Sequence, residues 1–221
     1  MNFIYRDKHL VVCSKEPGLL SEHTPGGDSL PDRIAIALGM PQDSVYVVHR
    51  LDRTTGGLMV FALEKETAAY LSARIQAGRF IKEYLALCEG ETVSETMVDQ
   101  LYFDRGRNQS FVVKKRPGAK EARLHSTVLG VLASPYPEVD KISLCRIQLD
   151  TGRTHQIRVQ FASRKHPLVG DRKYGARCRT KDTALWSAHL AFVHPDGTPL
   201  DFTLDARTLF PMLEDVPDIL W

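Results

Sequence analysis

The segment Val45 to Ala62 reads V-Y-V-V-H-R-L-D-R-T-T-G-G-L-M-V-F-A. An apolar run rich in β-branched residues leads into a polar sequence, a Thr-Thr-Gly-Gly turn follows, and a second apolar run begins at Leu58. This pattern predicts two buried strands joined by a polar crossing. Arg50 and Arg53 flank Asp52 and favour its ionised form, and the strands would hold it on a stiff scaffold. Asp52 is therefore the candidate reactive group; the alternative is that it only accepts hydrogen bonds from its own turn.

A second segment, Thr151 to Gly175, reads T-G-R-T-H-Q-I-R-V-Q-F-A-S-R-K-H-P-L-V-G-D-R-K-Y-G. Together with His49-Arg50-Leu51-Asp52 it closely resembles the RluA-type family of RNA pseudouridine synthases. The resemblance covers nearly the whole chain, and several ordered motifs are more specific than any one of them. The other matching motifs are Leu10-Val11-Val12 with Lys15-Glu16-Pro17-Gly18, Ile81-Lys82-Glu83-Tyr84-Leu85-Ala86, Gly118-Ala119-Lys120-Glu121-Ala122, and Ala188-His189-Leu190 through His194-Pro195.

Charge is distributed unevenly along the chain. The 221 residues include 29 Lys and Arg against 27 Asp and Glu, a formal net charge of +2. The segment from Thr151 to Leu185 holds nine basic and two acidic residues, a local charge of +7, whereas Asp196 to Trp221 holds one basic and six acidic residues, a local charge of −5. A localised cationic surface suits an enzyme that binds a polyanion. The alternative is a solvated face whose charges pair with the acidic tail.

The cysteine pattern and the hydropathy indicate a cytoplasmic protein. Four cysteines are widely spaced without a Cys-x-x-Cys pair, which favours reduced thiols and argues against a zinc site. The N-terminus is too weakly apolar for an export signal, and no stretch approaches the roughly 18 apolar residues of a membrane span. We expect no membrane partner.

Periodicity predicts the secondary structure around the two segments. Apolar spacing predicts helices over Leu30 to Leu38, over Glu64 to Arg79, and from Thr154 to His166, the last capped by Thr151 or Thr154. Strands are expected over Phe80 to Cys88 and Ile142 to Leu149, with a closing hairpin from Leu185 to Leu204. The family resemblance implies an α+β fold, a mixed and mostly antiparallel sheet with flanking helices around a central RNA-binding cleft. We expect a monomer with a single catalytic domain over residues 1–221 and no separate N-terminal RNA-binding domain.

Two regions have the composition of RNA-binding surfaces. Strand alternation places Tyr84 and Lys82 on one face, where a phenol beside an ammonium group suits stacking on a nucleobase, although a strand Tyr more commonly packs in a core. The polar, basic segment from Asp104 to Arg123 predicts a projecting hairpin or loop that could grip phosphates through Lys115 and Arg116. The alternative is an exposed hairpin that contacts nothing.

The resemblance also implies the chemistry: isomerisation of uridine to pseudouridine in ribosomal or transfer RNA, with no cofactor and no metal. Asp52 would act as nucleophile or as base, and the family does not settle which. Arg158, with Arg153 as the alternative, would keep that carboxylate charged, and Tyr84 would pack on the flipped uracil. The RNA-contacting set is Arg50, which would fill the vacated space, Arg153, which would meet a phosphate, and His49, Lys82, Lys115 and Arg116.

One departure from the family pattern and two rival functions complete the sequence-based predictions. The family usually has Thr-Ser-Gly after the Asp motif, but this chain has Thr55-Gly56-Gly57, a change that we expect to loosen the turn. A metal-dependent phosphohydrolase would need a ligand set, for which the only pool is His49, Asp52, His155, His166 and Asp171, without metal-binding spacing. A catalytically inactive RNA-binding protein of the same fold is the other rival.

Overall fold

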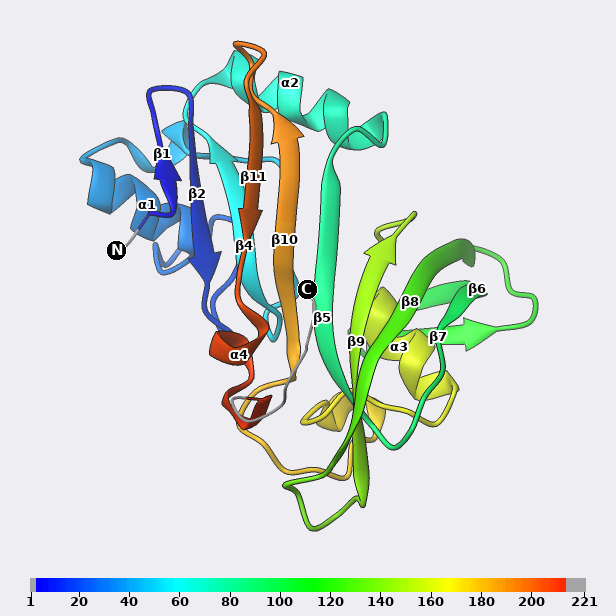
Figure 1. Cartoon of the computed structure of the whole chain (residues 1–221). Helices are drawn as coiled ribbons and strands as arrows, with labels where there is room; N and C mark the ends of the chain where they lie inside the picture. The colour runs from blue at the N-terminus through cyan, green and yellow to red at the C-terminus, as the bar shows by residue number, and fades with distance from the viewer. Residues whose placement is uncertain (1–2, 214–221) are drawn as a thin grey trace. The chain divides into compact units, whose positions relative to one another are not determined.

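The computed structural model describes residues 3–213, which form two compact units (Figure 1). Within these residues, unit 1 comprises residues 3–82 and 186–204, and unit 2 comprises residues 83–185 and 205–213. Part of the acidic tail noted in the sequence, residues 214–221, lies outside the described residues. The single catalytic domain stays a prediction.

Unit 1 is built on a mixed sheet. Its strands are β1 (Tyr5–Arg6), β2 (Leu10–Lys15), β3 (Tyr46–Val47), β4 (Gly56–Ala62), β10 (Leu185–Val193) and β11 (Pro199–Thr203). Strand β4 pairs antiparallel with β2 and β3 and parallel with β10, and β10 pairs antiparallel with β11. Every residue of β4 is buried, which explains why its sequence is a continuous apolar run and does not alternate between apolar and polar residues.

The core of unit 1 forms where helix α2 (Lys65–Gln76) packs on this sheet. Leu71 of α2 joins Leu58 and Val60 of β4 and Leu190 of β10 in one cluster, which Phe80 extends. Burying each of these large apolar side chains contributes roughly 1.5–3 kcal/mol. The α2 prediction is confirmed, although the helix ends at Gln76, three residues before the predicted Arg79.

Helix α1 (Leu30–Leu38) has the bounds that the sequence predicted. The Asp32 N–H donates to Ser29 Oγ, and the Ser29 N–H donates to Asp32 Oδ2, so the first turn carries a complete capping box. Hydrogen bonds from Ser29 and His23 outweigh burial and lower the pKa of Asp32 to about 2. Gly39, with a left-handed φ of 66°, ends the helix. A short 3₁₀ turn, η1 (Gln42–Ser44), follows.

Unit 2 contains an antiparallel sheet in the order β5-β9-β8-β6-β7. Its strands are β5 (Ile81–Glu89), β6 (Glu95–Asp104), β7 (Gln109–Val113), β8 (Lys120–Ala133) and β9 (Lys141–Leu149). Helix α3 (Gln156–Ser163) packs through Val159 on Leu101 of β6 and Ala122 of β8, behind the strands in Figure 1. The shorter elements are η2 (Arg172–Tyr174), α4 (Ala206–Leu209) and η3 (Pro211–Leu213).

The predicted fold class is confirmed, and local details differ. The sheets are mixed and mostly antiparallel with few helices, as the α+β prediction requires. The segment from Asp104 to Arg123, predicted as a hairpin or loop, contains strand β7 and the turns on either side of it. Strand β7 pairs antiparallel with β6, which completes the hairpin. The predicted Thr cap of α3 is wrong: His155 occupies the N-cap with a left-handed φ of 54° and makes no capping hydrogen bond through its side chain.

Candidate active site

Asp52 lies in unit 1, in the turn between β3 and β4, as the sequence predicted. The Thr55 N–H donates to the Asp52 carbonyl at 3.0 Å and closes the turn. The preceding Leu51 is held through both backbone groups by Ser21, whose Oγ donates to the Leu51 carbonyl at 2.8 Å and accepts from its N–H at 3.2 Å. These hydrogen bonds fix the turn that carries Asp52. The Asp52 side chain is half-buried and therefore still faces solvent.

The sequence analysis missed Lys15, a fully buried lysine that holds this turn. Its Nζ donates to the carbonyls of Glu16, Leu19 and Arg53 at 3.0–3.2 Å. Desolvation lowers the pKa of Lys15 to about 8; the negative charge of Asp52 acts in the opposite direction, and the positive charge of Arg53 adds to the lowering. A buried cation thus lies within electrostatic range of the candidate carboxylate. The Lys-Pro motif after the first strand was the available signal for it.

His49 lies in the interior of unit 1, with 8% of its surface exposed. The Val60 N–H donates to His49 Nε2 at 3.2 Å, and the ring packs against Phe80. Burial, with a smaller contribution from the positive charge of Lys82, lowers the pKa of His49 to about 3, so the imidazole is neutral at physiological pH. This geometry gives His49 a structural role, and its contact with RNA stays a prediction.

The two arginines beside Asp52 are exposed and differ in what they contact. Arg50 Nη1 donates to Glu22 Oε2 at 2.8 Å in an ion pair whose two side chains are mostly exposed. Arg53 Nε donates to the Gly18 carbonyl at 2.9 Å, and the Gly18 N–H donates to the Arg53 carbonyl at 2.7 Å. Arg53 therefore ties the turn to the loop after β2, whereas Arg50 extends into solvent.

Gly56 and Gly57 belong to strand β4, not to a loosened turn, so the expectation drawn from the missing serine is wrong. A Cβ on Gly56 would come within 2.4 Å of the Trp186 ring, and one on Gly57 would come within 2.2 Å of the Ser187 carbonyl. The Trp186 ring occupies the space that a serine would need, and it lines a cleft of about 730 Å³ together with Lys15 and Leu19. The chain therefore packs tightly where a relative would carry a hydroxyl.

Arg158 lies in unit 2, on the first turn of α3, where the sequence placed it. Its Nε and Nη2 donate to the two carboxylate oxygens of Asp171 at 2.7 and 2.8 Å, and both side chains are buried. The guanidinium also lies 5.1 Å from the centre of the Tyr174 ring. A bidentate buried pair fixes the orientation of Arg158. The sequence analysis had placed Asp171 among possible metal ligands and missed this pairing.

Arg153 is exposed at the turn before α3. Its Nε donates to the Glu121 carbonyl at 2.9 Å, and its N–H donates to Gln156 Oε1 at 3.0 Å. Thr151 donates to the same Gln156 oxygen at 2.8 Å. The Gln156 amide thus organises the turn that the sequence analysis had assigned to a threonine cap.

The remaining predicted residues divide between the two units. Lys82 is half-buried in unit 1, and burial lowers its pKa. Tyr84 is buried on β5 of unit 2, opposite Ile147 of β9. Lys115 and Arg116 are exposed in the turn between β7 and β8, and the Arg116 guanidinium stacks on the Tyr102 ring at 3.6 Å.

The turn of unit 1 therefore brings together Asp52, Arg50 and Lys15, while Arg158, Arg153 and Tyr84 belong to unit 2. The assembly of Asp52, Tyr84 and Arg158 into one catalytic set stays a prediction. Within residues 3–213, no three His, Cys, Asp or Glu side chains gather in a way that could hold a metal ion.

Comparison with known proteins decides the family. The sequence model described as RNA pseudouridylate synthase matches residues 9–163, which include the Asp52 turn and Arg158. The chain belongs to this family. Relatives named ribosomal large subunit pseudouridine synthase D confirm the RluA-type resemblance; the one from Vibrio cholerae is 31% identical over 224 residues, covering 91% of this chain and 66% of the relative.

Other pseudouridylate synthase family members are similarly distant. A Bacillus subtilis protein named uncharacterized RNA pseudouridine synthase YhcT is 31% identical over 202 residues, covering 88% of this chain. The chain spans 65% of that relative, so it corresponds to about two thirds of the length of these curated family members. The solved structure of human RNA pseudouridylate synthase domain containing 1 has the same fold, with a TM-score of 0.76 at 21% identity over 93% of this chain and 83% of that one. In residues 3–213, no helix is long and apolar enough to cross a membrane.

Proposed function

We propose that this protein is an RNA pseudouridine synthase that isomerises uridines in ribosomal RNA. The observation that carries the proposal is the family match across the segment that holds Asp52 on its fixed, half-exposed turn. Several relatives are named for the large ribosomal subunit, which favours ribosomal over transfer RNA as the substrate.

The reaction needs a uridine outside its helical stack. Extruding the base costs a few kcal/mol, which contacts to the flipped base and to the remaining helix must offset. We propose that Arg50, exposed beside Asp52, fills the vacated space, and that Tyr84 packs on the uracil. The bond between N1 of uracil and C1′ of ribose then breaks, the ring rotates, and C5 bonds to C1′. C5 loses a proton and N1 gains one, so the atoms balance without an oxidant or reductant.

Asp52 is the proposed reactive group, as nucleophile or as base. Both roles need an ionised carboxylate, and nearby positive charge stabilises that form. Lys15 supplies such a charge within unit 1. We propose Arg158 as the second source, because its bidentate contact with Asp171 fixes its guanidinium in a single orientation.

The remaining proposed RNA contacts come from both units. Arg153 and Lys115 are exposed and would meet phosphates, and Arg116, preorganised by stacking on Tyr102, would meet a phosphate or a base. Lys82 and His49 complete the set predicted from the sequence. We also propose a monomer in the cytoplasm, where its four buried free cysteines would stay reduced.

The test is Asp52→Asn, which keeps the size and shape of the side chain but removes its charge. We expect RNA affinity within about twofold of wild type and a loss of pseudouridine formation of at least about a thousandfold, by analogy with removal of other covalent or acid–base groups. Pseudouridine-specific chemical mapping of RNA after incubation measures the activity. Asp43→Asn, an exposed aspartate of the same unit, is the matched control and should behave as wild type. Turnover by Asp52→Asn near the wild-type rate would remove Asp52 from the mechanism.

The rival function has its own readout in the same experiment. Wild-type protein that binds RNA but forms no pseudouridine in RNA from cells lacking the gene would indicate an inactive RNA-binding protein.

A further inference from the structure

The loop of unit 2 that follows Asp171 displays arginines on its solvent side. Arg177 and Arg179 are exposed, whereas Cys178 between them is fully buried. Both arginines line the same cleft, so one ligand can contact both guanidinium groups.

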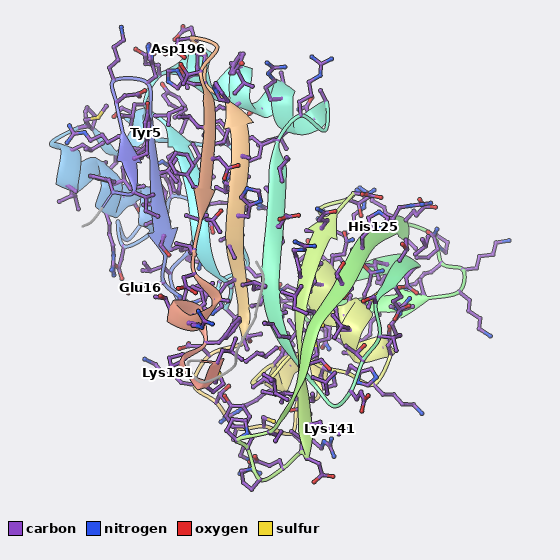
Figure 2. The ribbon with its side chains drawn as sticks, in the orientation of Figure 1. Tyr5, Glu16, His125, Lys141, Lys181 and Asp196 are labelled. Carbon is purple, nitrogen blue, oxygen red and sulfur yellow. The ribbon has the colours of Figure 1, made fainter. Side chains whose placement is uncertain are left out.

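These arginines line an open cleft of about 510 Å³. Arg172 and Ala176 of the same loop complete one wall, and Glu138, from the turn between β8 and β9, lies on the other. Figure 1 shows this turn and the loop after α3 at the same end of unit 2. Lys181, labelled in Figure 2, continues the basic character of the loop. Three arginines against the carboxylates of Glu138 and the buried Glu89 leave a net positive charge at the cleft.

The loop is held in place by buried contacts, so the arginines are presented by a fixed scaffold. At its start, Asp171 is locked to Arg158, and the backbone of Gly170 packs so closely that a Cβ there would come within 2.0 Å of Thr180 Oγ1. In its middle, the Cys178 N–H donates to Oε1 of the buried Glu89 at 2.7 Å. A preorganised cationic site binds an anion with a smaller entropic cost than flexible side chains do.

The partners of these arginines leave them available to an anion. Arg177 Nε lies 3.5 Å from Glu89 Oε2 while two thirds of its side chain stays exposed. In the described part of the chain, no carboxylate accepts a hydrogen bond from Arg172 or Arg179. Burial raises the pKa of the Cys178 thiol to about 12, so this cysteine stays protonated and the loop is not a thiolate site.

We propose that the cleft lined by Arg172, Arg177 and Arg179 binds backbone phosphates of the RNA substrate. The proposal rests on the proposed function for its choice of ligand. Guanidinium groups match phosphate oxygens in paired hydrogen bonds, and contacts to phosphates position an RNA without reading its sequence. The cleft thus supplies RNA affinity from a part of unit 2 that the predicted RNA-contacting residues do not include.

The test replaces all three cleft arginines by glutamine in the full chain. Fluorescence anisotropy with a fluorescein-labelled RNA hairpin measures the affinity over a range of salt concentrations, and thermal unfolding verifies the fold. The control variant removes the same charge from exposed positions of unit 1: Arg6→Gln, Lys65→Gln and Arg79→Gln. We expect the cleft variant to bind the RNA about tenfold more weakly than wild type at low salt. The slope of log affinity against log salt should become less steep by about two to three. The control should stay within about twofold of wild type.

The outcomes separate this proposal from the proposed function. A cleft variant that unfolds like wild type and retains the salt slope of the control would overturn the phosphate site. If wild type forms no pseudouridine but the slope falls as expected, the proposed function fails while the cleft stands. If the triple variant does not fold, the single variants Arg177→Gln and Arg179→Gln each remove one charge, and a salt slope unchanged from wild type in both would overturn the proposal.

Discussion

The Asp52 turn of unit 1 and the Asp171 loop of unit 2 are each held by a buried cation, Lys15 of β2 and Arg158 of α3, and the two cations are stabilised differently. Lys15 donates to three backbone carbonyls, whereas Arg158 makes a bidentate pair with a buried carboxylate. Desolvation lowers the pKa of Lys15 to about 8, although the negative charge of Asp52 acts in the opposite direction. A cation that is bound by backbone carbonyls stabilises the conformation of the backbone. A cation that is paired with a carboxylate instead has its own side chain fixed in one orientation. The two loops should therefore respond differently to the loss of one partner.

The largest expected effect on stability is that of Asp171→Asn. The change removes the buried carboxylate charge that pairs with Arg158, and breaking a buried pair in this way costs roughly 3–5 kcal/mol. Urea denaturation measures the free energy of unfolding, and Asp182→Asn, an exposed aspartate of the same loop, is the control that should lie within about 0.5 kcal/mol of wild type. A loss below about 1 kcal/mol would mean that the pair is not what holds the loop.

Lys15→Met should lower the free energy of unfolding by less, about 2–3 kcal/mol. The three backbone carbonyls lose their hydrogen-bond donor, but the change leaves no buried charge behind. The variant should also change the pH dependence. The unfolded lysine has its pKa near 10.4, above the value of about 8 in the folded protein, so the unfolded state binds more protons between these values. Wild-type stability contributed by this group therefore rises from pH 8 to about 10.4. Denaturation at a series of pH values should show this rise in wild type and not in Lys15→Met; an equal rise in both would assign it to another group.

The smallest expected effect comes from the contact between Gly56 and Trp186 beside the turn. Gly56→Ser forces its Cβ against the ring and should cost about 1–3 kcal/mol. Trp186→Ala removes the obstacle, so the double variant should be more stable than the sum of the two single changes predicts. Strictly additive changes in the free energy of unfolding would show that the ring moves away at no cost.

Much of the fold was predictable because local pattern and tertiary structure agree in it. The apolar spacing and the capping residues of α1 gave its bounds, and the uninterrupted apolar run of β4 indicated a strand buried on both faces. Two predictions failed for different reasons. Gly56 and Gly57 look like turn residues but pair with β10, a contact distant in sequence. Thr151 looks like a helix cap, but its hydroxyl donates to the side chain of Gln156, five residues away.

The candidate site was predictable in its residue types and less so in its supports. Asp52 lies in the turn and Arg158 on the helix where the sequence placed them, whereas the buried pairing of Asp171 is recognisable only from burial and from a partner 13 residues away. An isolated aspartate in a sequence is normally exposed, and nothing in its near neighbours indicates otherwise.

The close approach of Trp186 to Gly56 has a consequence for protein engineering. A chimera that imports strand β4 from a relative with serine at this position would meet the indole ring, and one whose β10 carries a smaller residue in place of Trp186 would leave a void above the glycine. The two strands must be exchanged as a set, although more than a hundred residues of sequence separate them.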